Sequence, residues 1–463
     1  MLLIGLVSFT HFGVHMSQVS LPPSLSRRRL LVGAAATAGA FGLGGASRSA
    51  LAQPTLPALR NGELLDVPDF SKLAASPYRV GIRPHRRKGV CLKVDPEPMR
   101  TARGTPKFLV HNYGHGGAGI TLSFGCAEVV REHVANLIER DLKRPARNIR
   151  VVVVGAGVIG LTTAAELKRW RPELDVRVMA KTIGPNRQVN VEQTTSWVAG
   201  GQFEPSGIWR EFGGPRPGDE LDDEPRPPLE VVHDYIRRSA NRIKALQRAG
   251  TQRAYGIVDR NNYTLQDYDG RQMPTMEGGF DSGTPPDVIP APALGTLPFA
   301  PLRHVAGREY QTWLINPTIL LKKLVADLRQ AGARFESRDL QTEAELRAID
   351  ADIIVNCTGL GSKTLLNDTK MVPISGQLVI LKNPNKLKYM FSGGCGSAVA
   401  YLFARQDDIV VGGTYDENID TPVIDELRCD TFLEQMRQVF CGNVVPCGLT
   451  SSATQCPVPV TRL

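Results

Sequence analysis

The feature that most constrains the fold is a glycine-rich turn between a hydrophobic strand and a helix. Residues 149–154 (IRVVVV) are almost all β-branched, which is typical of a strand buried on both faces of a parallel sheet. The turn GAGVIG follows at 155–160, and helical spacing of apolar residues continues to Trp170. In such a turn the glycines permit tight bending, close approach of a pyrophosphate and close helix–strand packing. With a second strand at 175–179, we predict a Rossmann-like βαβ unit that binds a dinucleotide.

One partner usual for this motif is missing. The second strand should end on an acidic residue that hydrogen-bonds the ribose hydroxyls. Lys181 stands there instead, and an ammonium group cannot accept a hydrogen bond. We expect Thr182, a backbone carbonyl or an acid elsewhere to make the contact. A basic residue is also compatible with the 2′-phosphate of NADP, so this motif alone leaves the cofactor open.

A second glycine-rich segment, HNYGHGGAG at 111–119, leads into a helix expected over about 121–141. A plain turn needs one or two glycines, whereas this loop has four within six residues. Backbone N–H groups at a helix N-terminus suit an anionic locus such as the N1–C2=O edge of a flavin. We expect His111 and His115 to order the loop rather than to act as general bases.

Five segments together resemble the D-amino-acid oxidase and D-aspartate oxidase family. They are HNYGHGGAGITLSFGCA, VVVVGAGVIGLTTAAEL, TTSWVAGGQFEP, IIVNCTGLGS and VGIRP. The first is specific to the family, and the others occur in many flavoproteins. The resemblance implies FAD as the cofactor. It also implies a mixed α/β fold, with a Rossmann-like FAD-binding domain on a parallel sheet and a substrate domain on a mixed or antiparallel sheet.

The resemblance also implies roles for single residues. Arg83 would clamp the substrate carboxylate, since a guanidinium fork matches a carboxylate. Tyr401 would bind the same carboxylate, and the carbonyl of Gly117 would accept the substrate amino group. The residues expected to contact FAD are Gly155, Ala156, Gly157, Val158, Ile159, Gly160, Thr182, Thr194, Thr195, Ser196, Gly201, Gln202, Thr358, Gly116, Gly117, Ala118, Gly119, Ile120 and Thr121.

The implied reaction is the oxidative deamination of a D-amino acid to a 2-oxo acid, ammonia and hydrogen peroxide. The α-hydrogen would pass as hydride to flavin N5, so the protein supplies orientation rather than a dedicated acid or base. A second active-site tyrosine often lies four residues before the first, but Ser397 stands there. Arg405 could favour an acidic side chain. A glycine or secondary-amine oxidase and a catalytically inactive flavin-binding secreted protein remain alternatives.

The motifs do not stand in the family's order. The G-x-R-P turn at Arg83 and the loop at 111–119 come last in the family but first here, which is the arrangement of a circular permutation. A mis-assembled gene, a fragment of a tandem pair and a decayed enzyme are the other interpretations. We expect a linker or arm at 53–77, FAD-binding parts at 78–205 and 316–375, substrate-binding parts at 206–315 and 376–440, and a C-terminal arm at 441–463.

The first 52 residues read as a twin-arginine export signal. Ser26-Arg27-Arg28-Arg29 precedes an Ala/Gly-rich apolar run and an Ala50-Leu51-Ala52 cleavage pattern, and Met16 is a plausible start. We therefore expect the Tat translocase as a partner and a periplasmic or secreted protein without a stable membrane anchor. The formal charge of +9 falls to +5 without the four arginines of this leader. No clustered basic surface follows, so we expect no nucleic-acid partner.

The eight cysteines match no zinc pattern, and we expect no metal site. Cys126 and Cys357 lie in apolar runs and are expected as buried thiols. Cys441, Cys447 and Cys456 lie close together and are the group most suited to disulfide bonding in an exported protein.

Overall fold

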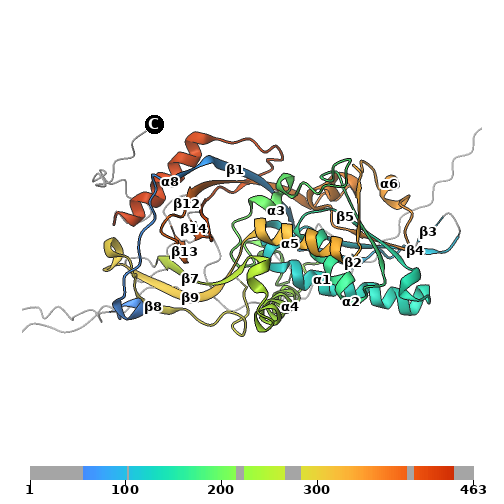
Figure 1. The fold of residues 1–463 in the computed structure, drawn as a ribbon, viewed down its shortest axis with the longest axis horizontal. Coiled ribbons are helices and arrows are strands. Elements are labelled where there is room, and N and C mark those ends of the chain that lie inside the picture. Colours follow the sequence, from blue (N-terminus) through green and yellow to red (C-terminus); the bar gives the residue numbers. More distant parts are fainter. Residues whose placement is uncertain are drawn as a thin grey trace, which may run out of the picture. The chain divides into compact units, whose positions relative to one another are not determined.

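The structure is a computed structural model that describes residues 56–97, 99–101, 104–214, 224–265, 283–393 and 401–442. The proposed leader, Ser397, Cys395, Cys447 and Cys456 lie outside these residues. The described chain from Thr55 onward forms one compact unit of two sheets with helices packed on them (Figure 1). The fold is mixed α/β, as predicted.

The first sheet has seven described strands in the order β10-β6-β5-β11-β4-β2, with β3 paired to β4. They are β2 Cys91–Val94, β3 Met99–Arg100, β4 Pro106–Tyr113, β5 Arg150–Val154, β6 Asp175–Ala180, β10 Arg334–Ser337 and β11 Ile353–Asn356. The five strands from β10 to β4 are parallel, and β2 and β3 run antiparallel at the edge. The predicted βαβ unit is therefore the centre of this sheet.

Both faces of β5 are covered, which explains its unbroken β-branched sequence. Val151 and Val153 face the core formed with α1 (Gly119–Asn136) and α2 (Val158–Trp170). Val152 and Val154 face the opposite core, which includes Leu346 of α6 (Glu343–Arg347). Figure 1 shows α1 and α2 on one side of this sheet and α6 on the other. Alternating side chains of a strand point to opposite faces, so two covered faces require apolar residues throughout.

The segment before β5 in the chain completes this sheet. β4 pairs in parallel with β11, and α1 packs against α2 and α4 (Leu229–Arg248). Val130 and Val134 are fully buried in the shared core, and Leu137 and Ile138 follow in a π-helical turn, η3 (Leu137–Leu142). The prediction that this apolar helix face needs the βαβ unit as its partner is confirmed.

The second sheet has nine described strands in the order β1-β12-β15-β14-β13-β7-β9-β8, with β16 paired to β12. They are β1 Leu73–Arg86, β7 Ile257–Leu265, β8 Ala293–Thr296, β9 Ala306–Ile315, β12 Met371–Lys382, β13 Tyr389–Ser392, β14 Tyr401–Ala404, β15 Asp408–Gly412 and β16 Asp416–Glu417. Only β13 and β7 pair in parallel. This is the mixed, largely antiparallel sheet expected for the second half of the molecule.

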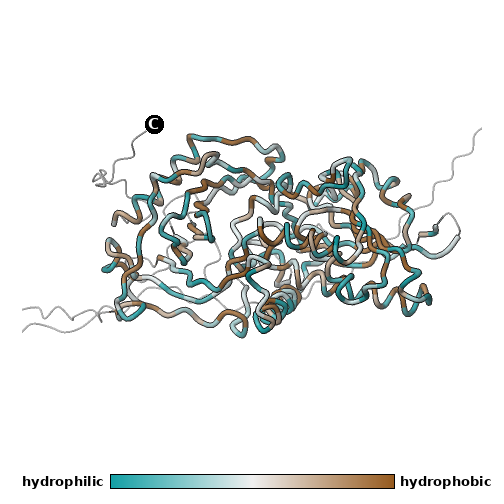
Figure 2. Tube along the Cα trace, in the orientation of Figure 1, coloured by the Kyte–Doolittle hydropathy of each residue, from teal (hydrophilic) through white to brown (hydrophobic). Residues whose placement is uncertain are grey.

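The remaining helices are α3 Thr195–Val198, α5 Pro317–Gln330, α7 Ser362–Leu365 and α8 Glu426–Phe440. Two of them, α5 and α8, begin at residues whose side chains cap them. Asn316 and Asp425 cap α5 and α8 by accepting backbone N–H groups, and Pro317 occupies the first turn of α5. Hydrophobic segments follow the strands and inward helix faces, and hydrophilic ones follow many outer turns (Figure 2). Among the described helices, none is both long and apolar enough to cross a membrane.

Two segments differ from what the sequence suggested. Residues 56–77, expected as a linker or surface arm, pack on the second sheet: Leu59 is buried, Leu65 donates its N–H to Pro298, and β1 already begins at Leu73. Residues 78–86, expected with the FAD-binding part, pair with β12 in the second sheet. The sequence of these residues contains prolines and shows no periodic pattern, so it does not predict the packing. The residues that they pack against lie more than 200 residues away in the chain.

Candidate active site

Two glycines of the turn after β5 are required by close backbone approaches. Gly155 has a φ of +120°, and a Cβ added to it would lie 2.3 Å from the carbonyl oxygen of Cys357. A Cβ on Gly160 would lie 2.0 Å from the carbonyl oxygen of Gly155. Gly157 differs, because its added Cβ would meet only the hydroxyl of Ser196, at 3.3 Å. The turn therefore packs tightly on its strand side and leaves room at its second glycine, where a pyrophosphate needs it.

The N-terminus of α2 is open to such a ligand. Gly157 is its N-cap and offers no side chain, and the N–H of Val158 donates to Ser196 Oγ at 3.0 Å. Ala156 is buried, and Ile159 packs partly on the core. The positive end of the helix dipole favours a phosphate there, although the N–H of Val158 already donates to Ser196.

The hydroxyl of Thr182 lies close in the chain to Lys181, where the motif usually has an acidic residue. It follows β6, it is buried, and it has no hydrogen-bond partner within the protein. A buried hydroxyl without a partner costs about 1–3 kcal/mol, so a group that binds there gains from satisfying it. Together with the open space at Gly157, this residue fits the ribose and pyrophosphate of a dinucleotide.

The second glycine-rich loop lies beside the first. Gly116–Ala118 forms a 3-10 turn, η2, that leads into α1, and a Cβ on Gly119 would lie 3.7 Å from Val158 Cγ1. Ile120, in the first turn of α1, is buried. Two helix N-termini that belong to distant parts of the sequence thus converge on one region, as expected for one long cofactor.

The strand before this loop is held in place by its own polar residues. Asn112 is fully buried on β4 and donates from Nδ2 to Thr163 Oγ1 of α2 at 3.1 Å. His111 and His115 are also buried, and this burial lowers their pKa values to about 4 and about 3. Both imidazoles are therefore neutral near pH 7, in keeping with side chains that order the loop.

Threonine and serine side chains surround the two loops. Thr194 donates to the carbonyl of Val191 at 2.6 Å, and Thr195 and Ser196 open α3. Thr358 follows β11 and hydrogen-bonds to Asn356 and Ser362. The expected contacts of these residues with FAD remain predictions.

Three further residues that were predicted to contact FAD make hydrogen bonds between the glycine-rich region and neighbouring segments. Gly201 has a φ of +101°, and its carbonyl accepts the N–H of Ile315 at 2.8 Å. Gln202 donates from Nε2 to the hydroxyl of Tyr310 at 3.1 Å. Thr121 donates to the carbonyl of Glu204 at 2.8 Å and accepts the N–H of the same residue at 3.0 Å. This hydroxyl thus ties α1 to the chain that follows the threonine-rich loop, by which we mean residues 194–201.

Arg83, on the edge strand β1 of the second sheet, contacts both Gly117 of the glycine-rich loop and Tyr401 of the interior strand β14. A Cβ on Gly117 would lie 3.6 Å from Arg83 Cδ. The guanidinium group of Arg83 lies over Gly376, because a Cβ added to Gly376 would fall 2.2 Å from Arg83 Nη1. The same nitrogen donates to the carbonyl of Thr414 at 3.1 Å. Burial raises the pKa of Tyr401, while the hydrogen bond and charge of Arg83 act in the opposite direction. The structure therefore brings together the three residues that the sequence proposed for the substrate.

The ring of Tyr401 is fixed by its neighbours. It stacks on Phe403 with 4.4 Å between ring centroids, and it packs on Gly412 of the adjacent strand, to which Tyr401 is the register partner. A Cβ on Gly200 would lie 2.8 Å from the Phe403 ring. The stacked rings thus reach from the second sheet to the threonine-rich loop.

Several neighbours of Arg83 were not identified from the sequence. Tyr415 lies beneath it, 5.7 Å from the guanidinium carbon to the ring centroid, and the carbonyl of Ser206 lies against Gly117. Gly376 was the one available signal, because a glycine within a strand often marks a close approach of another group. Arg405, expected as a possible specificity residue, is almost fully buried and pairs with Asp408 at 2.6 Å and 2.7 Å. Its charge is already neutralised, so it does not serve an acidic substrate.

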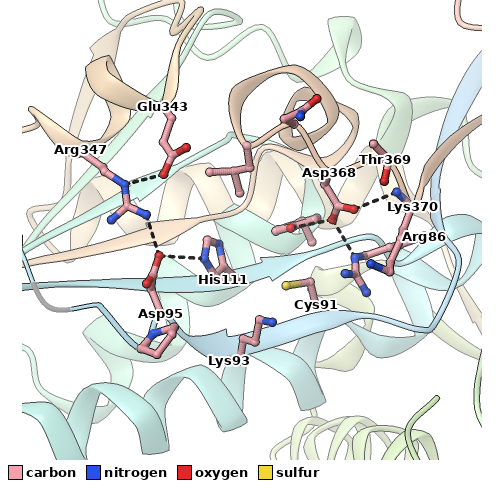
Figure 3. Close-up of a pocket in the computed structure, with 14 residues that line it drawn as sticks. Arg86, Cys91, Lys93, Asp95, His111, Glu343, Arg347, Asp368, Thr369 and Lys370 are labelled. Carbon is pink, nitrogen blue, oxygen red and sulfur yellow. Dashed lines mark hydrogen bonds and ion pairs between the residues drawn. The ribbon is translucent and has the colours of Figure 1, made fainter. Parts of the chain in front are cut away.

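A separate cavity of about 340 Å³ lies on the other side of β4 (Figure 3). Arg347 pairs with Asp95 and Glu343, and Arg86 pairs with Asp368, across its walls. His111 lines it, but Arg83, Gly117 and Tyr401 do not. Most of its charged side chains are engaged in ion pairs, and we assign it no ligand.

The cysteines agree with the predicted types where they are described. Cys126 and Cys357 are buried free thiols, and Cys441 is disulfide-bonded. Among the residues that the structure describes, no group of three or more histidine, cysteine or acidic side chains could hold a metal ion.

Comparison with known proteins gives the family. Residues 150–457 match the model of the DAO family, described as FAD dependent oxidoreductase. A D-amino-acid oxidase of Streptomyces coelicolor is 30% identical over 284 residues, which cover 59% of this chain and 72% of that enzyme. The human D-aspartate oxidase is 24% identical over 274 residues, which cover 57% of this chain and 68% of that enzyme.

Solved structures show a weaker likeness. An iminodiacetate oxidase from Chelativorans sp. BNC1 aligns with a TM-score of 0.44 and 19% identity, covering 63% of this chain and 78% of its own. A glycine oxidase from Bacillus cereus aligns with a TM-score of 0.41 and 16% identity, covering 62% and 77%.

Proposed function

The chain belongs to the DAO family of FAD-dependent oxidoreductases, and from this premise we propose that it is a D-amino-acid oxidase. The observation that carries the proposal is the meeting of Arg83, Tyr401 and Gly117 beside the two glycine-rich loops. An amino acid presents a carboxylate and an amino group on one carbon. A cation, a hydroxyl and a carbonyl at one place match those two groups.

FAD is the cofactor of the family, and the described residues fit it. The α2 N-terminus at Gly157–Val158 would hold the pyrophosphate, and the orphaned hydroxyl of Thr182 would meet a ribose. The loop at Gly116–Thr121 would place its backbone N–H groups against the flavin ring. When bound, FAD supplies the acceptor for the hydrogen and electron pair that leave the substrate Cα, and oxygen takes them on as hydrogen peroxide.

The protein's own part is to bind and orient the substrate. Arg83 donates from Nη1 to the backbone carbonyls of Ser375 and Thr414 and has further donors for a carboxylate, which Tyr401 would share. The carbonyl of Gly117 would accept a hydrogen bond from the amino group, so the Cα hydrogen takes one fixed direction. Holding the two reactants in this way accounts for much of the rate without an acid or base.

The test is to purify the protein, record its visible spectrum and measure peroxide released from D-alanine, D-aspartate, glycine and sarcosine. We expect a flavin spectrum and peroxide from at least one D-amino acid, at a higher kcat/KM than from glycine or sarcosine. The opposite ranking would make it a glycine or secondary-amine oxidase. Bound flavin with no peroxide from any of these substrates would make it an inactive flavin-binding protein.

We also propose that the chain is a functional circular permutation of the family. β4 lies next to β11 in the sheet although it precedes β5 in the chain, and the family match begins only at residue 150. The connection from Lys143 to Asn148 is short and ends in a 3-10 turn, which requires the end of η3 and the start of β5 to be neighbours.

The permutation is tested by restoring the order of segments that is usual in the family. Residues 56–142, which keep β1 whole together with the packed segment before it, are moved behind residue 440, and the mature chain begins near Asn148. The restored chain should bind FAD and oxidise the same substrate. A restored chain that folds but binds no FAD would contradict the permutation.

Export by the twin-arginine route is a further proposal, and it rests on residues 26–52 alone. Replacing Arg27 and Arg28 together by lysine should block export and leave folded protein in the cytoplasm, which fractionation measures. An unchanged exported yield would show that the leader works in another way.

A further inference from the structure

His85 lies on β1 two residues after Arg83, at a point where three segments meet. Its Nε2 lies 3.2 Å from Oε1 of Glu211, which ends the 3-10 turn η6 (Ile208–Glu211). Its ring packs on the glycine loop, because a Cβ on Gly116 would fall 2.8 Å from His85 Nδ1. A backbone bridge between His85 and His115 joins β1 to the same loop.

Glu211 receives donors from more than one segment. The backbone N–H of Lys88, in the turn after β1, donates to its Oε2 at 3.0 Å, and Arg226 forms an ion pair with the same oxygen. The Glu211 side chain is only 14% exposed. Burial alone would raise its pKa, but the hydrogen bonds from His85, Lys88 and Arg226 lower it to about 2. The carboxylate is therefore a permanent negative anchor at the end of η6.

The residues just before η6 lie over the proposed substrate groups. A Cβ on Gly117 would lie 3.2 Å from the carbonyl oxygen of Ser206 and 3.6 Å from Arg83 Cδ. Ser206 thus shares the space beside Gly117 with the Arg83 side chain. Because η6 follows directly, the way Glu211 is anchored fixes where Ser206 lies.

We propose that His85 and Glu211 are a positioning pair that holds residues 206–211 against the glycine loop and thereby sets the spacing between the Gly117 carbonyl and the Arg83 guanidinium. The inference rests on the proposed function, because those two groups are assigned there to the amino and carboxylate ends of the substrate. Neither His85 nor Glu211 touches the substrate. Their contribution is the geometry of the residues that do.

The test uses the full-length protein with FAD bound, in the variants His85→Gln, Glu211→Gln and their combination. Glu336→Gln is the matched control, because Glu336 also pairs with an arginine, Arg177 at 2.8 Å, but on β10 at the far edge of the first sheet. Three quantities are measured: amide hydrogen exchange of residues 206–212, the calorimetric Kd of propionate, a carboxylate without an amino group, and kcat and KM for D-alanine.

Both single variants should speed exchange in residues 206–212 but not in α1 or α2. The Kd of propionate and the KM of D-alanine should rise by about tenfold, with kcat changing less, and the control should match the wild type. The double variant should be no worse than the poorer single variant, because both remove the same contact. If Glu211→Gln does not fold, His85→Gln carries the test, since it leaves Glu211 its other donors.

Unchanged exchange in residues 206–212 would overturn the positioning pair whatever the activity. Faster exchange throughout the protein would also overturn it, by showing general destabilisation. Wild-type protein that binds propionate and oxidises D-alanine, with variants that do so equally well, would refute this inference alone. Wild-type protein that does neither would refute the proposed function, and the inference with it.

Discussion

The two sheets of the molecule contribute to the site in different ways. Around the first sheet the chemistry comes from backbone, since Gly155 allows close packing of the turn, and Gly157 and Gly116 stand at the N-termini of α2 and η2. On the second sheet it comes from the side chains of Arg83 on β1 and Tyr401 on β14. A cofactor with fixed phosphates suits rigid backbone loops, and a small substrate suits a few directed side chains. Substitutions should therefore affect cofactor and substrate separately.

The largest effect is expected from Gly160→Ala. Its Cβ would lie 2.0 Å from the Gly155 carbonyl oxygen, so the α2–β5 packing must open, at a cost of about 4 kcal/mol or more. Gly157→Ala is the matched control, because its Cβ would meet only Ser196 Oγ. We expect Gly160→Ala to lower Tm sharply, and Gly157→Ala to keep Tm of the FAD-free protein but to lose flavin. Wild-type Tm in Gly160→Ala would break the comparison.

Arg83→Leu should come next, on the substrate side alone. A charge-assisted bidentate contact contributes about 2–4 kcal/mol, so kcat/KM for D-amino acids should fall about 30- to 1000-fold. Flavin content should stay that of the wild type, because Arg83 lies on β1 of the second sheet. Arg83→Lys, which keeps the charge but not the fork, should be intermediate. Loss of flavin in Arg83→Leu would show that the two functions are not separable.

Tyr401→Phe should have a smaller effect of the same kind. The ring keeps its stacking on Phe403 and its packing on Gly412, so stability should not change. Loss of one hydrogen bond of about 0.5–1.5 kcal/mol should raise KM about 2- to 12-fold. Steady-state kinetics measure this, and an unchanged KM would remove the hydroxyl from carboxylate binding.

The smallest effect is expected from Thr182→Val, on the cofactor side. The FAD-free protein should be as stable or slightly more stable, since a buried hydroxyl without a partner is removed. FAD should dissociate about 2- to 12-fold more readily, for the loss of one hydrogen bond. Lys181→Ala should leave the Kd of FAD near that of the wild type. If Lys181→Ala weakens FAD more than Thr182→Val does, the ribose contact is assigned to the wrong residue.

The difference between the two sheets also explains which parts of the fold and of the site could be predicted from the sequence. The first sheet was predictable, because β5, its glycine turn and α2 are contiguous and each glycine has a local reason. The loop at 111–119 was recognisable in the same way. Among the candidates for the ribose contact, the sequence did not favour Thr182, because only the structure shows that its hydroxyl is buried without a partner.

The substrate side was less predictable, because it depends on pairing between distant strands. Arg83 lies over Gly376 only because β1 pairs with β12, nearly 300 residues later in the chain. Arg405 stands close to Tyr401 in sequence, yet it turns to Asp408 and is buried. Ser206, Glu211 and Tyr415 carry no motif, and only the fold brings them to Arg83. Sequence spacing predicts such neighbours poorly when no single element contains them.

The most direct test of the account is to add D-alanine, without oxygen, to the purified protein with its bound flavin. The account predicts that the visible flavin band bleaches, that L-alanine does not bleach it, and that Arg83→Leu bleaches only at much higher D-alanine concentrations. This result requires cofactor and substrate to meet where the two sheets bring Gly117, Arg83 and Tyr401 together. A flavin band that persists in wild-type protein at saturating D-alanine, D-aspartate and other D-amino acids would contradict it.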